Sequence, residues 1–134
     1  MDVVGTMFFK DSKLLIDKPR KRPTFQMIGG KVESGETPLM AAIRECHEEL
    51  GNEAIFDEEL FELVMEFDEV ATSDGITPIH FYVFQYNGQL DGKLNISDEI
   101  EMFKWFDSSC SYDILSNTLK NEVVPYCLKK KLIK

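Results

Sequence analysis

The sequence lacks the features that mark several specialised classes of protein. Its three cysteines, Cys46, Cys110 and Cys127, are odd in number, far apart, and form no CxxC pair. They exclude a disulfide framework, and no matching histidine spacing indicates a zinc site. We interpret them as reduced thiols and expect a cytoplasmic protein.

Long apolar runs are also missing. No stretch approaches the roughly 20 residues that a helix needs to cross a bilayer. The start, Met1-Asp2-Val3, has no basic region of the kind that opens a signal peptide. We therefore expect no membrane span and no secretory leader.

Positive charge is scarce. With 15 Lys and Arg against 24 Asp and Glu, the formal net charge is −9, which argues against a nucleic-acid partner held by a basic face. The charge is uneven, because residues 33–69 hold thirteen acids and a single Lys or Arg, Arg44. This segment is either a solvated acidic surface or a cation-binding region.

Internal repeats, low-complexity tracts and long linkers are absent as well. A chain of 134 residues with 43% apolar and 29% charged residues suits one compact domain spanning residues 1–134. The pattern of apolar residues predicts extended segments at 3–9, 13–17, 24–28, 61–70, 79–86 and 101–106, and helices at 38–50, 112–119 and 122–133. The predicted fold class is α/β, or α+β with a mixed sheet, with helices on both faces of that sheet.

The helix at residues 38–50 has the clearest boundaries. Thr37 is a good N-cap, Pro38 suits the first helical position, and Gly51 stands where a left-handed residue commonly ends a helix. At about 100° per residue the apolar side chains form one stripe, which we expect to face the core. The stripe consists of Leu39, Ala42, Ile43, Cys46 and Leu50.

Three carboxylates lie close together on another face of this helix. Glu45, Glu48 and Glu49 fall within an arc of about 100°, with Ala41 one turn earlier. They repel one another at the negative end of the helix dipole, and Arg44 alone cannot offset them. A hard divalent cation, Mg²⁺ or Mn²⁺, would neutralise the cluster. The alternative is an exposed, glutamate-rich helix.

A glycine-containing loop is predicted directly before the helix. Residues 29–36 read Gly-Gly-Lys-Val-Glu-Ser-Gly-Glu and would present free backbone amides and carbonyls near the acidic face. Glycines let a backbone approach a phosphate or a metal closely. The loop therefore favours the cation-binding interpretation over the exposed helix.

Together, these segments resemble the Nudix box. The residues that carry the resemblance are Gly30, Glu36 after five intervening residues, Arg44-Glu45 after seven more, Glu48-Glu49, and the closing Gly51. The pattern covers about a sixth of the chain. Its fixed spacing makes a chance agreement improbable.

Three positions depart from the usual form of the box. Cys46 stands where a large aliphatic residue is usual, Asn52 replaces the closing aliphatic residue, and Ile28 replaces a proline. Cys46 is a small hydrophobic residue on the core stripe, so it affects packing rather than chemistry. The other two concern the shape of the flanking loops.

The resemblance implies a Nudix-type α/β/α sandwich and an enzyme that hydrolyses nucleoside diphosphates linked to another moiety. The implied metal ligands are the Gly30 carbonyl oxygen and the carboxylates of Glu45, Glu48 and Glu49. Glu45 is implied either as such a ligand or as the general base, and Arg44 and Glu36 as residues that orient the glutamates. The implied cofactor is Mg²⁺, with Mn²⁺ as the alternative.

Three residues outside the glutamate cluster are further candidates. Glu99, in a loop before the 101–106 strand, is a second candidate base, with a solvated loop acid as the alternative. Lys31, with the basic loop at 18–22, is a candidate for binding phosphates, and the alternative is again a solvated loop. Asn121 resembles the asparagine that reads the purine edge in MutT-type enzymes, and its alternative role is an N-cap.

The predicted function is a divalent-cation-dependent nucleoside triphosphate pyrophosphohydrolase that resembles MutT-type enzymes and acts on a small nucleotide. Two alternatives stay open. One is hydrolysis of ADP-ribose or a dinucleoside polyphosphate, and the other is a non-catalytic module that senses nucleotides. Binding of a nucleotide without product would favour the second.

Overall fold

The computed structural model describes residues 1–71 and 74–134. The strands are β1 (Asp2–Met7), β2 (Phe9–Lys10), β3 (Lys13–Pro19), β4 (Ile28–Lys31), β5 (Ala54–Ile55), β6 (Phe61–Val70), β7 (Pro78–Tyr86), β8 (Asp91–Gly92) and β9 (Ile100–Phe106). The helices are α1 (Pro38–Leu50), α2 (Val124–Lys129), short 3₁₀ helices at Glu58–Leu60 and Tyr112–Ile114, and a π-helical turn at Leu119–Val123. Among the described residues, no helix is long and apolar enough to cross a membrane.

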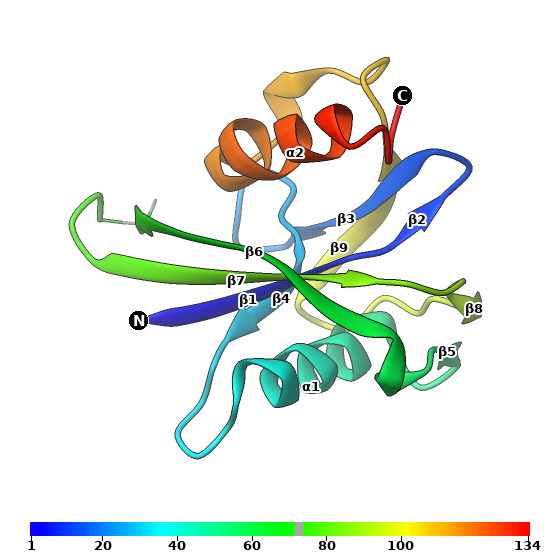
Figure 1. Cartoon of the computed structure of the whole chain (residues 1–134), viewed down its shortest axis with the longest axis horizontal. Helices are drawn as coiled ribbons and strands as arrows, with labels where there is room; N and C mark the ends of the chain where they lie inside the picture. The colour runs from blue at the N-terminus through cyan, green and yellow to red at the C-terminus, as the bar shows by residue number, and fades with distance from the viewer. Residues whose placement is uncertain (72–73) are drawn as a thin grey trace.

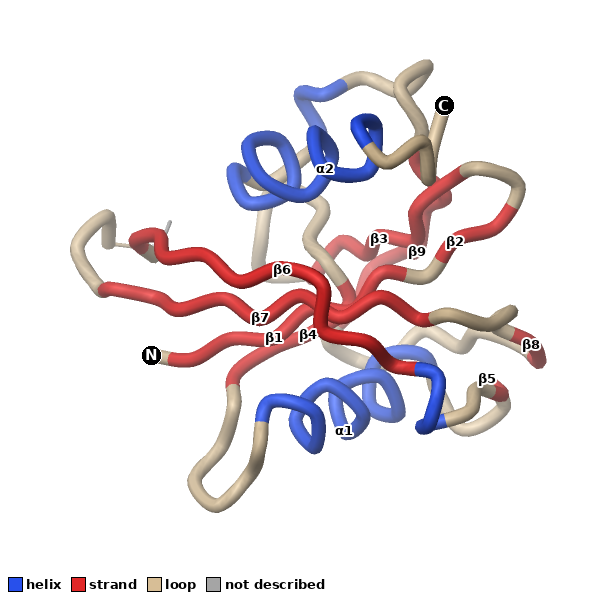
Figure 2. The backbone as a smooth tube through the Cα atoms, viewed as in Figure 1, coloured by secondary structure: helices blue, strands red, loops and turns tan. Residues whose placement is uncertain are grey.

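The central sheet is mixed. Its strand order is β4-β1-β7-β6, in which β1 runs parallel to β7 and the other neighbours are antiparallel. Strands β2, β3 and β9 form an antiparallel sheet of their own. Figure 1 shows α1 on one side of the strands and α2 on the other, and Figure 2 shows the same layers by element type. The predicted α/β/α sandwich is confirmed.

Helix α1 and strand β6 begin and end at the predicted residues. The Thr37 side chain accepts a hydrogen bond from the Met40 amide at 3.1 Å, which caps α1. Gly51 follows with a positive φ of 89°, as expected, but its ψ of 172° is extended. The chain therefore leaves α1 in an extended direction rather than through a left-handed turn.

The two glycines before the helix lie in a strand, so the prediction of a loop at this point was wrong. Gly29 and Gly30 belong to β4 and pair with Gly5 and Val4 of β1. A Cβ atom at Gly29 would lie 2.0 Å from the Val4 carbonyl oxygen. Glycine is needed here because two backbones approach closely within the sheet.

The C-terminal helical segments also differ from the prediction. The first of them is interrupted after Tyr112–Ile114, because Leu115 and Ser116 pair with Phe25. The second segment starts earlier than predicted, at Asn117, and passes through the π-helical turn into α2. Pro125 has no amide hydrogen and so donates no bond within the helix. The amide of the preceding Val124 donates to the Leu119 carbonyl five residues back, which is the π-helical pattern.

The core has parts on both sides of the sheet. The larger part packs α2 and the preceding turn against the strands, and the smaller part holds Cys46 and Leu50 of α1. One prediction about the α1 stripe was wrong, because Leu39 is 39% exposed; Ala41, one turn before the glutamates, is fully buried. Ala41 packs against Val4 of β1. The helix face that carries Ala41, Glu45 and Glu49 is thus turned toward the sheet, with Glu48 at its exposed edge.

Candidate active site

Arg44 connects the parts of the box. Its guanidinium donates to both carboxylate oxygens of Glu36, at 2.7 and 3.0 Å, and to the Lys31 carbonyl at 2.9 Å. It also donates to Glu45 at 2.8 Å and to Glu48 at 3.2 Å. One side chain of α1 therefore links the loop after β4, the end of β4 and two glutamates.

These contacts shift the pKa values of the linked groups. The hydrogen bonds from Arg44 hold the pKa of Glu36 below its usual range, and Glu36 in turn raises the pKa of Arg44. Burial raises the pKa of Glu45, and the nearby Glu48 carboxylate adds to this effect while Arg44 opposes it. Glu36 and Arg44 are thus held in their charged forms.

Glu45 lies against the backbone of β4. A Cβ atom at Gly30 would stand 2.6 Å from the carboxyl carbon of Glu45, so only glycine leaves space for this carboxylate. The Glu45 side chain is 15% exposed, whereas that of Glu48 is 58% exposed. The predicted ligands Gly30 and Glu45 are thus brought together, and Glu48 lies at the outer rim.

Glu49 lies deeper and has different neighbours. Its carboxylate accepts a hydrogen bond from the Gly29 amide at 3.0 Å. Its other close neighbour is the carboxyl group of Asp17 on β3, a residue that the sequence analysis did not identify as part of the site. Burial is the largest cause of the raised pKa of both carboxyls, and their proximity raises the pKa of Glu49 further.

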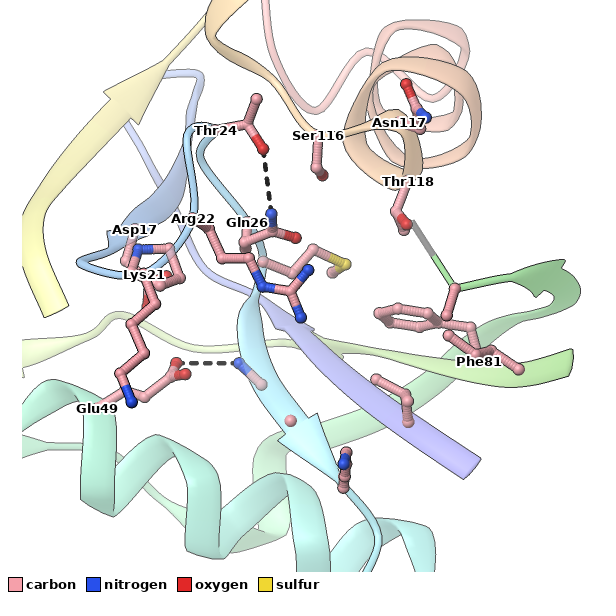
Figure 3. A pocket seen from close by; sticks show the side chains of 18 of the residues that line it. Asp17, Lys21, Arg22, Thr24, Gln26, Glu49, Phe81, Ser116, Asn117 and Thr118 are labelled. Atoms are coloured by element: carbon pink, nitrogen blue, oxygen red, sulfur yellow. Dashed lines mark hydrogen bonds between the residues drawn. The ribbon is translucent and has the colours of Figure 1, made fainter. Parts of the chain in front are cut away.

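A cavity of about 740 Å³ opens beside Glu49, within the size range of small-molecule sites. Asp17, Gly29, Gly30 and Glu49 line one end of it. The basic loop contributes Arg20, Lys21 and Arg22, and the far wall contains Phe81, Ser116 and Thr118. Figure 3 shows Lys21 and Arg22 on the side of Asp17 and Glu49, with Phe81 and Thr118 across the cavity.

The other predicted site residues divide between two hollows. Lys31 and Glu99 line the large cavity, and the Glu99 carbonyl accepts a hydrogen bond from the Arg20 amide at 2.9 Å. Asn121 lines a second hollow of about 350 Å³. Asn117 lies on the rim of both, with its side chain pointing outward in Figure 3. Helical periodicity extended back to Asn117 would have placed it at the start of the helix.

The side chains of the site supply only some of the ligands that a divalent cation needs. Within residues 1–71 and 74–134, no group of three His, Cys, Asp or Glu side chains stands close enough to hold a metal ion. Mg²⁺, however, is commonly held by one or two carboxylates together with water and substrate phosphate oxygens. The closely apposed Gly30 and Glu45, and the buried Glu49, meet that lesser requirement.

Comparisons with known proteins agree with this geometry. The NUDIX domain family matches residues 1–111, whereas no curated protein sequence matches the chain. Among solved structures, a MutT NUDIX hydrolase from Burkholderia pseudomallei is 20% identical with a TM-score of 0.73, and the match covers 96% of this chain and 95% of that one. The E. coli ORF135 protein is 25% identical with a TM-score of 0.67, and 96% of this chain and 89% of that one are covered.

A third similar structure belongs to a larger protein. It is a bifunctional NMN adenylyltransferase/ADP ribose pyrophosphatase from Francisella tularensis, complexed with AMP and a Mn ion. It is 20% identical with a TM-score of 0.70, and the match covers 97% of this chain and 41% of that one. The shared fold is that of the Nudix-type sandwich.

The chain belongs to the Nudix family, because the family's domain matches most of its length and its box residues lie together on α1 and β4. It is accordingly a pyrophosphohydrolase that acts on anhydrides of phosphorus-containing compounds. Enzymes of this family generally use divalent metal ions and act on small nucleotide substrates.

Proposed function

We propose that the protein is a Mg²⁺-dependent nucleoside triphosphate pyrophosphohydrolase of the MutT type, with Mn²⁺ as an alternative cation. The carrying observation is that a single cavity joins the buried glutamate end of the box to a basic loop and to a polar and aromatic wall. A triphosphate needs the first two features, and a base needs the third.

The residues that would hold the cation are Gly30, through its carbonyl oxygen, and Glu45, Glu48 and Glu49, through their carboxylates. When bound, the ion offsets phosphate charge and makes a water molecule more acidic. Arg44 and Glu36 keep Glu45 and Glu48 in place through the hydrogen bonds described above.

Two residues are candidates for the proton acceptor. Glu45 has a raised pKa and lies beside Gly30, which suits a base at the metal end of the cavity. Glu99 lines the same cavity from the loop before β9. Glu99→Gln separates them, because a large loss of kcat with unchanged Mn²⁺ binding identifies Glu99 as the base, whereas unchanged kcat assigns that role to Glu45.

The substrate would lie along the cavity. Lys21, Arg22 and Lys31, which line it, would contact phosphate oxygens, while Phe81 would offer a ring face and Gln26 an amide to the base. Asn121 would contact the substrate only where the substrate extends past Asn117 into the second hollow.

Hydrolysis of a nucleotide panel tests this function. With Mg²⁺ present, nucleoside triphosphates, including oxidised purine forms, are expected to give a monophosphate and pyrophosphate. Turnover confined to ADP-ribose or a dinucleoside polyphosphate would show that this compound, and not a nucleoside triphosphate, is the substrate. Thermal stabilisation by nucleotides without any product would identify a sensing module instead.

Two matched variants test the assigned residues. Glu48→Gln and Glu49→Gln are expected to lower kcat by about 100-fold or more, because each removes a carboxylate from the cation. Glu59→Gln, which makes the same change at an exposed position of the 3₁₀ helix, is the control. Unchanged activity in both test variants would refute the assignment.

A further inference from the structure

Asp17 is the most unusual charged residue of the described chain. It is fully buried, at 0% exposure, directly after the buried apolar run Leu14–Leu15–Ile16 of β3. Neither of its carboxylate oxygens has a hydrogen-bond partner among the described residues. A buried carboxylate without a partner is strongly unfavourable, so a residue of this kind needs an explanation.

The backbone around Asp17 is held on both sides. On one side Asp17 pairs with Phe103 of β9, and on the other its amide and carbonyl bond to Gln26 at 3.0 and 2.7 Å. The side chain is thus confined by strands rather than carried on a mobile loop. It lines the same cavity as Gly29, Gly30 and Glu49, and Figure 3 shows Asp17 and Glu49 on the same side of it.

The group that faces Asp17 satisfies it only when the two share a proton. The neighbouring carboxyl belongs to Glu49, and when both groups are ionised both are acceptors. No Lys, Arg or His forms an ion pair with Asp17 or Glu49 within the part of the chain that the structure describes. When ionised, the pair therefore needs a positively charged partner that the described residues do not supply.

We propose that Asp17 is a further ligand of the divalent cation held by Glu49, so that the metal site extends from the Nudix box to strand β3. The proposal rests on the proposed function, which supplies the cation. Two carboxylates from different elements, with water and substrate phosphate oxygens, are a sufficient set for Mg²⁺. Asp17 would be a ligand that this chain adds outside the box.

Binding of Mn²⁺ to the full-length protein without nucleotide tests the proposal, and electron paramagnetic resonance of free Mn²⁺ is the readout. Asp17→Asn is expected to weaken Mn²⁺ binding by at least about tenfold, in the range caused by loss of residues that support a metal. Glu49→Gln is expected to weaken it similarly. Asp91→Asn removes the same charge at an exposed position and serves as the matched control.

Thermal unfolding separates a metal ligand from a structural residue. Without metal, Asp17→Asn is expected to unfold at a higher temperature than the wild type, because an amide can donate to Glu49 and carries no charge. Added Mn²⁺ should then stabilise the wild type more than the variant. A lower unfolding temperature together with unchanged Mn²⁺ affinity would overturn the proposal.

A thiolate at the same position provides a second test if Asp17→Asn does not fold. Asp17→Cys is expected to bind Cd²⁺ and to show ultraviolet thiolate-to-cadmium absorption, because thiolates favour soft metals. The wild type and Asp91→Cys should lack this band. Its absence in Asp17→Cys would overturn the proposal.

The two proposals fail in different ways. If the wild type hydrolyses nucleotides and the Asp17→Asn variant binds Mn²⁺ as tightly as the wild type, only the role of Asp17 is refuted. Wild-type protein that neither binds Mn²⁺ nor hydrolyses any nucleotide in the panel would overturn both.

Discussion

Two groups of carboxylates in the same site differ in how their charge is balanced. Glu36, Glu45 and Glu48 share the guanidinium of Arg44, which contacts all three. Asp17 and Glu49 are more deeply buried, and the Gly29 amide is the one donor found for them among the described residues. Each carboxylate of the first group has a cationic partner within the chain, whereas the second group needs a proton or a cation from outside.

The largest expected effect comes from removing the internal balance. Arg44→Met should lower kcat/KM by about 100-fold, because Glu45 and Glu48 lose their common partner. It should also lower the free energy of unfolding by about 2 kcal/mol, less than for a fully buried pair because Arg44 is partly exposed. Hydrolysis assays and urea unfolding measure the two effects.

Lys129→Met is the control for this change, since it removes a positive charge from the exposed end of α2. It should leave both quantities unchanged. Wild-type activity in Arg44→Met would mean that the glutamates are positioned without it, and the contrast between the two groups would disappear.

A smaller effect on the site is expected from a substitution at Gly30 of β4, which lies against the Glu45 carboxylate. Gly30→Ala should weaken Mn²⁺ binding by about tenfold, because the new methyl group would displace the Glu45 carboxylate. Calorimetric titration with Mn²⁺ measures this affinity. Ser34→Ala, in the exposed loop before α1, should bind Mn²⁺ as the wild type does. Equal affinities in all three proteins would show that Glu45 is not constrained by β4.

The unbalanced pair should make the metal-free protein sensitive to pH. The pKa values of Asp17 and Glu49 are raised in the folded state, so the folded protein binds more protons than the unfolded chain above the ordinary carboxyl pKa of about 4. The free energy of unfolding should therefore fall as pH rises above that value, by about 1–2 kcal/mol between about pH 5 and 8.

Urea unfolding in a chelator, repeated with saturating Mg²⁺, measures this dependence. The cation should reduce or reverse the decline, because it binds the ionised carboxylates. Asp17→Asn should flatten the decline without metal. If the pH dependence of the free energy of unfolding is the same in Asp17→Asn as in the wild type, the Asp17–Glu49 pair is not its origin.

The smallest effect is expected at a third cluster, outside the cavity. His80 on β7 lies 2.7 Å from Asp68 and 2.9 Å from Glu66, and the hydrogen bonds that its protonated ring donates to Glu66 and Asp68 raise its pKa. Its stabilising contribution is full below the ordinary histidine pKa and is lost as pH rises through the raised value. His80→Gln should thus be slightly less stable than the wild type at about pH 6 and as stable as the wild type at about pH 9.

Thermal unfolding at the two pH values measures the difference, and hydrolysis should be unaffected. In this cluster the positive partner of the carboxylates is a histidine, which loses its charge as pH rises. The cluster is therefore intermediate between the carboxylates paired with Arg44 and the Asp17–Glu49 pair, which has no positive partner among the described residues. A His80→Gln variant that loses activity would connect this exposed cluster with the site.

Local features of the sequence predicted some of these elements well. Helix α1 carries its own capping residue, an initial proline and a closing glycine, and β6 alternates apolar and acidic residues. Both signals act over a few residues, so both elements have the predicted bounds. Gly29 and Gly30 were interpreted as a loop because their role depends on the neighbouring strand β1.

Asp17 shows the limit of the same reasoning. In the sequence it is one acid at the end of an apolar strand, and its neighbour Glu49 belongs to a helix that follows much later. The start of the last helix is another example, because pairing with Phe25 ends the earlier segment and places Asn117 on the cavity rim.

By itself, the sequence determined the spacing of the box, the register of α1 and hence the set of glutamates that share one helix face. These features follow from helical periodicity, which is local. Only the tertiary structure decided that this face turns toward the sheet, that Gly30 accommodates Glu45, and that Asp17 meets Glu49. Those contacts arise from strand pairing and helix packing between distant segments, which local patterns do not encode.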